Sequence, residues 1–498
     1  MTGLVPSTNS TKHGYVRKAA GAIGVKPTSP AWQTMFKGSF GIKASLTRGR
    51  SNDIRGDGQA GSTFLTDMQN GGPIATELKY QHLDDFIEAG VKGIWANQPY
   101  IKVVTLDTEI SDVSTTALTV SAGGASFVAG HLTRTLNFPT AGNNKLARVS
   151  SSTGTSITYP AATFTAESNP IPVGASVRAV GFQGASGDLA MTVTGGNGMT
   201  STALDFTTLG NGVAVGRRIW IGDKVAGSAN SFNTAGCNGW ARISAVAAHR
   251  LSFDVVPSGF GADTGTGKTI QCFTCDFVKN GTTVYAFDWE GQQQDIAVPA
   301  YEYFYDDVLN NLTMTLTGGK EITVNFDFIG NLCDPISTTR YTGSSDVAAP
   351  TYGTMTATSN VGDLTENNVS LMGGVNVMSA GSIKISNNVQ RSPVVGPLGS
   401  AAINIGELTV SGTCDTFLAD TSIMAQGIAN TLTSFGTFTG NNSGDKEGYY
   451  WDVPAIRITP DSEVSGKNQG RKVSGPWEAE PHPTLGYTIS VGRFWYLP

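Results

Sequence analysis

Short runs of alternating apolar and polar residues dominate the sequence, and turns rich in Gly, Asn and Ser separate them at spacings of about ten residues. The clearest case is 312–330, where two alternating runs flank a Gly-Gly turn and predict a β-hairpin. One short helix is expected at 81–91, because its apolar residues recur at helical spacing on one side. Long amphipathic helices are not visible. The pattern therefore predicts an all-β fold, a sandwich or barrel with short helices.

One phrase occurs twice. Residues 140–150 read TAGNNKLARVS and residues 234–244 read TAGCNGWARIS, 94 positions later, with seven of the eleven residues identical. An apolar stretch ending in Gly precedes each copy and a hairpin pattern follows it, so the phrase is interpreted as a turn-and-hairpin scaffold. Units of about 85–95 residues have the size of small β-sandwich modules. We therefore expect an insertion at 103–275 that consists of two such modules.

The remainder of the chain shows a second, weaker echo. GPIATELKYQHLDDFIEAG at 72–90 resembles GELTVSGTCDTFLAD at 406–420, with Glu77-Leu78 aligned to Glu407-Leu408. The segments that flank the insertion, taken together, have nearly the length of the C-terminal segment. These observations favour a duplicated core fold. The expected organisation is an N-terminal arm, a first core domain split by the insertion, a linker and a second core domain: 1–35, 36–102 with 276–335, 336–370 and 371–498.

Composition limits the function classes. The formal net charge is −6 and the pI is about 5.5, whereas tight binding of nucleic acid needs clustered Lys and Arg. No apolar run approaches the roughly 20 residues that span a bilayer, and the N-terminal stretch lacks the hydrophobic segment of a secretory signal. The five cysteines are too few for a disulfide framework in so long a chain, so reduced thiols and assembly in a cytoplasm are expected.

Motifs that suggest chemistry are incomplete. GADTGTGKTI at 261–270 ends like a phosphate loop, but Ala262 stands where that loop needs glycine, and a strand-like run follows instead of a helix. Cys272 and Cys275 lack a second pair of metal ligands nearby. The acid pairs 84–85 and 306–307 suit first turns of short helices, where they stabilise the helix dipole. The five histidines are scattered. We therefore expect no enzyme activity, no cofactor and no metal site.

The segments outside the insertion resemble the tail-tube proteins of long-tailed bacteriophages. The resemblance covers 36–100 and about 276–498, and the following stretches carry it: SNDIRGDGQ (51–59), GPIATELKYQHLDDFIEAG (72–90), GSIKISNNVQRSPVVGPLGS (381–400), GELTVSGTCDTFLAD (406–420) and YYWDVPAIRITPDSEVSG (449–466). It implies stacked rings of β-sandwiches in the virion tail, with double-stranded DNA passing through the lumen without tight binding. Implied partners are further copies of the chain and the terminator, tape-measure and distal tail proteins, with no membrane. The alternative is a β-rich phage fibre or adhesin that binds surface glycans.

Three finer expectations follow. The Gly-rich loop 45–62 is expected to be disordered in isolation and to contact neighbouring subunits or rings through its charged residues, which are Arg48, Arg50, Asp53, Arg55 and Asp57. The insertion 103–275 is expected on the outside of the tube, since an inward position would obstruct DNA. A duplicated core favours a ring of three chains with approximate six-fold character, and a single core would need six chains.

Overall fold

The computed structural model describes residues 8–19, 22–167, 170–223, 225–373, 376–396, 399–441, 444–463, 467–468 and 470–498. The chain forms two compact units: unit 1 comprises 1–94, 279–435 and 453–480, and unit 2 comprises 95–278, 436–452 and 481–498. Strands dominate both units, and the described residues contain two short α-helices. The predicted all-β fold is confirmed.

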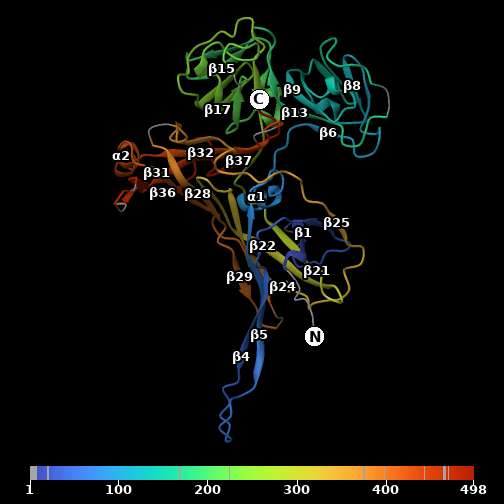
Figure 1. Cartoon of the computed structure of the whole chain (residues 1–498), viewed down its shortest axis with the longest axis vertical. Coiled ribbons are helices and arrows are strands. Elements are labelled where there is room, and N and C mark those ends of the chain that lie inside the picture. The colour runs from blue at the N-terminus through green and yellow to red at the C-terminus, as the bar shows by residue number, and fades with distance from the viewer. Residues whose placement is uncertain are drawn as a thin grey trace. The chain divides into compact units, whose positions relative to one another are not determined.

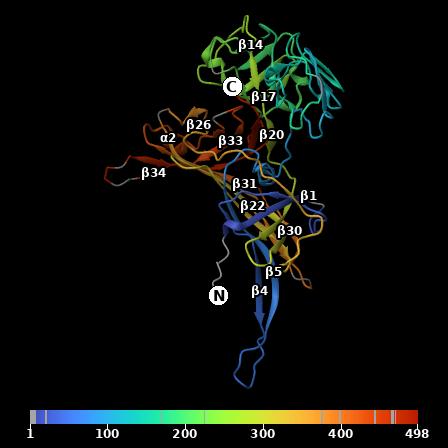
Figure 2. The same ribbon diagram turned by 45° about the vertical axis from the view of Figure 1, so that its right-hand side comes forward.

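Unit 1 contains most of the long strands and both α-helices (Figures 1 and 2). Its elements are β1 Thr11–Ala19, β2 Ala31–Thr34, β3 Ser39–Phe40, β4 Lys43–Arg50, β5 Thr63–Glu77, α1 Asp84–Val91, β21 Tyr285–Gln293, β22 Ala300–Thr317, β23 Thr323–Gly330, β24 Leu332–Cys333, β25 Ser345–Val347, β26 Val361–Glu366, β27 Val369–Ser370, β28 Met378–Ser386, β29 Gln390–Pro393, β30 Ser400–Asn404, β31 Thr409–Phe417, α2 Ser422–Ile428, β34 Asp461–Glu463, β35 Lys472–Ser474 and β36 Pro476–Ala479.

The predicted hairpin at 312–330 is confirmed as β22 and β23. Leu312 pairs with Phe326, and both side chains are buried. On its other edge β22 pairs with β28, so that Leu312 also lies opposite Ile385. β28 pairs with β31. Segments that the sequence assigned to two separate core domains therefore share one sheet within unit 1.

The predicted short helix is confirmed as α1, and it packs on β22. A Cβ added to Gly90 would lie 3.1 Å from the side chain of Leu312 and 3.6 Å from that of Leu309. The glycine therefore allows the close approach of helix and strand. In α2 the equivalent residue is Gly427, whose added Cβ would lie 2.1 Å from Pro460 and 3.2 Å from the carbonyl oxygen of Ile458, at the end of β33 (Gly448–Ile458).

Two sets of elements have similar local arrangements, in a residue alignment that differs from the predicted one. β5 leads to α1 as β31 leads to α2. Glu77 ends β5, whereas Glu407 precedes β31, so the two residues occupy different places in their strands. A better match is Tyr-Phe-Tyr-Asp at 303–306 in β22 with Tyr-Tyr-Trp-Asp at 449–452 in β33, and the same offset brings Leu312 onto Ile458.

Unit 2 contains the predicted insertion together with two C-terminal segments. Its elements are β6 Tyr100–Lys102, β7 Ile110–Val113, β8 Ala117–Val120, β9 His131–Leu136, β10 Leu146–Arg148, β11 Ser151–Thr153, β12 Ser156–Thr158, β13 Ser176–Gln183, β14 Leu189–Thr192, β15 Gly198–Ser201, β16 Arg218–Ile221, β17 Gly239–Ala247, β18 Arg250–Val255, β19 Gln271–Phe273 and β37 Ser490–Phe494, and β20 Asp276–Lys279, β32 Thr433–Gly440 and β33 contribute to both units.

The repeated phrase builds the same turn in two neighbouring modules. Asn144 accepts a hydrogen bond from the backbone N–H of Phe138 at 2.8 Å and donates one to its carbonyl at 2.9 Å. Asn238 does the same with Phe232, at 2.9 and 3.0 Å. Separate hydrophobic clusters lie within 103–179 and 182–272. The phrase therefore recurs because each module needs an amide side chain to hold its turn.

The insertion does not fold apart from the C-terminal segments of unit 2. Asp452 in β33 is buried and accepts hydrogen bonds from Arg218 of β16 at 2.7 Å and from Arg242 of β17 at 3.1 Å. The two arginines hold the pKa of Asp452 below its usual range against the effect of burial, which raises it. Phe438 and Tyr450 share a hydrophobic cluster with insertion residues. The compact unit is thus wider than 103–275, and 371–498 is divided between the units.

Asn144→Ala and Asn238→Ala should each destabilise the protein by about 1–3 kcal/mol, because each leaves a buried backbone N–H and carbonyl without a partner. Gly142→Ala, in the first of these turns, is the control: its added Cβ meets nothing within 4 Å, so the change should stay within about 0.5 kcal/mol. Urea unfolding followed by tryptophan fluorescence measures all three. Equal stability of the control and either asparagine variant would contradict the assigned role.

Candidate assembly surface

The hairpin formed by β4 and β5 extends away from the other strands of unit 1 in both views (Figures 1 and 2). Its strands pair from Lys43↔Gly71 to Arg50↔Thr63, and 51–62 form the tip. Of the predicted loop 45–62, residues 45–50 therefore lie in the paired ribbon, and the remaining residues form its tip. Almost every residue of β4 is exposed. A ribbon of two strands in water is marginally stable, so a partner surface would stabilise it.

The five predicted interface residues all lie on this hairpin, but the structure brings only two of them together. Arg55 and Asp57 form an ion pair at 2.9 Å within the tip, and the hydrogen bond from Arg55 lowers the pKa of Asp57. Arg48 and Arg50 stand near the outer end of β4, opposite Leu65 and Thr63. Asp53 lies in the tip, where its backbone N–H donates to Ser51.

Apolar side chains accompany these charges. Ile54 is fully exposed at the tip, and Leu46 and Phe64 are 50% and 52% exposed on the ribbon. Exposed apolar residues grouped on one element mark contact surfaces. The Gly-rich composition of the loop drew attention to its charges, and the apolar residues were not considered. The hairpin therefore carries both apolar and charged groups that can contact another protein.

A second hairpin, formed by β29 and β30, contacts the first through the side chain of one arginine. Arg391 donates to Asp67 at 3.0 Å, to Gln69 at 2.6 Å and to the carbonyl of Met68 at 3.0 Å. The hydrogen bond from Arg391 lowers the pKa of Asp67. The second hairpin lies between β28 and β31 in the chain, whereas the first lies between β3 and α1. Reading the sequence alone did not single out Arg391, because its partners are more than 300 residues away.

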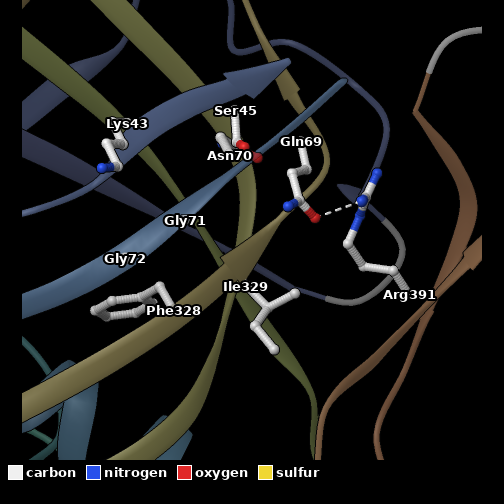
Figure 3. Close-up of a pocket in the computed structure, with 9 residues that line it drawn as sticks. All are labelled: Lys43, Ser45, Gln69, Asn70, Gly71, Gly72, Phe328, Ile329 and Arg391. Atoms are coloured by element: carbon white, nitrogen blue, oxygen red, sulfur yellow. Dashed lines mark hydrogen bonds between the residues drawn. The ribbon is translucent and has the colours of Figure 1, made fainter. Parts of the chain in front are cut away.

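A cavity of about 360 Å³ opens at the root of the first hairpin (Figure 3). Lys43, Gln69 and Arg391 supply polar groups, and Phe328 and Ile329 supply an apolar wall. Gly71 and Gly72 have φ values of 133° and 146°, and an added Cβ at either would lie within 2.4 Å of a neighbouring carbonyl oxygen. The glycines thus permit close packing of the strands at this root.

Three of the motifs that suggested chemistry lie in strands and turns of the described residues. Lys268 of the Gly-Lys-Thr sequence donates to the carbonyl of Gly227, and β19 follows it. Cys272 and Cys275 are buried free thiols whose pKa is raised by burial. Asp306 and Asp307 lie in β22 and not in a helix; that prediction was wrong. The described residues contain no group of three His, Cys, Asp or Glu side chains placed to hold a metal ion.

The all-β fold agrees with the result of a comparison with protein families. A family model described as phage tail tube protein matches residues 186–479, which is more than half of the chain. The chain belongs to this family. Its members are structural proteins of the virion tail, as the resemblance implied. Comparison with individual curated proteins gives no match.

The family match changes one expectation and leaves others as they were. It begins at residue 186, before β14, and so includes the second module of the predicted insertion. That module was expected to depart from the family. Membership also favours a tube over the fibre considered from the sequence. No helix in the described part of the chain is long and apolar enough to cross a membrane.

Arg391→Ala should destabilise unit 1 by about 1–3 kcal/mol, because it removes hydrogen bonds between charged groups and frees the second hairpin. Arg391→Lys should recover only part of this, since an ammonium cannot form the same fork. Arg457→Ala is the matched control: its ion pair with Glu480 is 3.1 Å long but exposed, so at most about 1 kcal/mol should be lost. Urea unfolding measures the stability of the three variants. Equal losses of unfolding free energy in Arg391→Ala and Arg457→Ala would contradict the role assigned to Arg391.

Proposed function

We propose that this chain forms rings that stack into the tail tube and that DNA is ejected into the host through the lumen of that tube. Two matching sets of elements support the proposal: β5 leads to α1 as β31 leads to α2, and 303–306 of β22 resembles 449–452 of β33. We interpret the match as an internal repeat of the core fold. Within one chain, the second copy of the fold joins the first by pairing β28 with β22. A chain built from two equivalent parts can use the equivalent edges to join the next chain, and such contacts close into a ring.

The repeat specifies which edges would meet. In the proposed repeat, Ile74 of β5 matches Gly412 of β31. Phe40 lies opposite Ile74, and Ile383 lies opposite Gly412, so Phe40 and Ile383 are equivalent. Leu312 and Ile458 are equivalent on the long strands. In the joint within the chain, Thr315 lies opposite Ser382. The corresponding joint between chains places Asp461 of one chain opposite Ser39 of the next.

Three chains then supply six equivalent parts, so a trimer with approximate six-fold character is the ring that we favour. The homohexamer remains the alternative if each chain contributes one lobe. The exposed β4–β5 hairpin contacts the neighbouring subunit or ring through Arg48, Arg50, Asp53, Arg55 and Asp57, together with Ile54. The modules of 103–275 face the outside of the tube. The acidic net charge suits a conduit that DNA crosses without tight binding.

Replacing 52–61 by Asn-Gly should give a folded protein that forms no tubes, because a two-residue turn can close the ribbon while the tip is lost. Ile54→Asn should shorten the tubes or abolish them with less than about 0.5 kcal/mol change in stability. Val173→Asn, at an exposed valine of the first module, is the control and should leave tubes intact. Negative-stain electron microscopy measures tube length, and normal tubes from the shortened tip would contradict the proposed contact.

A double variant, Ser39→Cys with Asp461→Cys, tests the joint between chains. Directly opposite residues of paired strands have Cβ atoms about 4.5–5.5 Å apart, within reach of a short bifunctional thiol reagent. Cross-linking of assembled protein should give covalent trimers on a denaturing gel, and each single variant should give none. Products confined to the monomer, or equal cross-linking by the single variants, would rule out this joint.

A further inference from the structure

Three carboxylates and one lysine are buried together where β1, β5, β21 and β22 meet in unit 1. Lys18 comes from β1, Asp288 from β21, and Asp306 and Asp307 from β22. All four side chains are less than 8% exposed. Asp306 has a φ of 60°, and the pairing of β21 with β22 shifts register beside it. This irregularity lets two successive aspartates of one strand both point into the interior.

Lys18 uses its donors on two of the three acids. Its ammonium lies 2.8 Å from Asp288 Oδ1 and 2.6 Å from Asp306 Oδ1, and it also donates to the carbonyl of Val25 at 3.1 Å. The backbone N–H of Gly24 donates to the other oxygen of Asp306 at 3.0 Å. An ammonium has three hydrogens. Asp307 therefore receives no hydrogen bond from the lysine.

Asp307 faces the amide of Asn70 instead. Asn70 Nδ2 donates to Asp307 Oδ2 at 2.9 Å and to the carbonyl of Tyr305 at 3.2 Å. Asn70 Oδ1 and Asp307 Oδ1 are both buried without a hydrogen-bond partner. Each lies 2.3 Å from the position that a Cβ on Gly330 would take. Turning the amide over would only exchange which oxygens face each other, because a carboxylate offers acceptors alone.

We propose that Asp307 is a neutral carboxylic acid in the folded protein and that its proton, donated to Asn70 Oδ1, closes a two-hydrogen-bond pair that fixes the root of the β4–β5 hairpin to β22. With this proton, Asp307 Oδ1 becomes the donor and Asn70 Oδ1 the acceptor of one hydrogen bond, so neither oxygen is left without a partner. Burial and the neighbouring carboxylates of Asp288 and Asp306 raise the pKa of Asp307 well above its usual range, whereas Lys18 opposes this. A further titratable group nearby is the thiol of Cys333 on β24, whose pKa is raised by burial.

The pair has a mechanical consequence. Asn70 immediately precedes Gly71 and Gly72, the glycines that allow close packing at the hairpin root. It is also the residue of β5 that lies opposite Gly330 of β23 and Ala44 of β4. Loss of the proton would place a carboxylate against the amide oxygen and release the root. This inference concerns the isolated chain and holds whatever the hairpin contacts in a tube.

Infrared difference spectroscopy of the unassembled protein tests the protonation. Burial raises the pKa of Asp288 to about 6, so at about pH 8 that group is ionised. The spectrum of the parent chain minus that of Asp307→Asn should then show the carbonyl stretch of a protonated carboxyl. Asp288→Asn is the matched control: this variant should keep the band, so the parent spectrum minus that of Asp288→Asn should not show it. The proposal is overturned if the difference for Asp307→Asn lacks the band, or if the band is lost in Asp288→Asn and kept in Asp307→Asn.

The stability of the same variants provides a second test. A raised folded pKa means that stability is fully present below the unfolded value, 3.8, and falls as pH rises toward the folded value. The unfolding constant of the parent chain divided by that of Asp307→Asn should therefore rise about tenfold per pH unit above pH 4. A ratio independent of pH contradicts the inference. In addition, Asn70→Ala should accelerate hydrogen exchange in 63–69, and unchanged exchange there would show that the pair does not hold the hairpin.

Discussion

Hydrogen bonding along both edges of β22 is the constraint on which unit 1 depends. Over 300–308 this strand pairs with β21, and over 311–317 with β28, while β23 and β24 occupy its opposite edge. The segments on either side of 336–370 consequently share backbone hydrogen bonds. Their relation is fixed by strand register, and a shift by one residue would turn the alternating buried side chains of Leu312, Met314 and Leu316 to the opposite face. Gly90 of α1 then packs on a strand whose position is already determined.

The same long strands also carry the buried charges. Asp306 of β22 and Asp452 of β33 occupy equivalent places in the Tyr-Phe-Tyr-Asp and Tyr-Tyr-Trp-Asp sequences, and each meets cations from another part of its own unit. Asp306 meets Lys18 of the N-terminal arm, and Asp452 meets two arginines of the module with β16 and β17. Removing one partner of a buried pair costs more than the pair itself contributes. These aspartates therefore join the N-terminal arm to β22 and the module with β16 and β17 to β33.

The sequence predicted what depends on local pattern. The hairpin of 312–330, the helix at 84–91 and the duplicated turns at Asn144 and Asn238 each follow from residues close in the chain. It did not predict contacts that join distant segments: Arg391 with Asp67, Asp452 with Arg218, or Asn70 with Asp307. Asp306 and Asp307 were assigned to a helix, because nothing local indicates that a strand can bury two adjacent acids. The predicted contact residues of the hairpin were chosen for their charge, so the exposed Ile54 beside them was not considered.

In the proposed ring, each chain provides two equivalent parts of the tail tube. Electron microscopy of assembled tubes, with the rotational power spectrum of end-on views, measures this most directly. The account predicts strong six-fold power from the core sandwiches and three-fold power from the modules of unit 2, in rings of three chains. Rings of six chains in which every subunit is related by strict six-fold symmetry would contradict it.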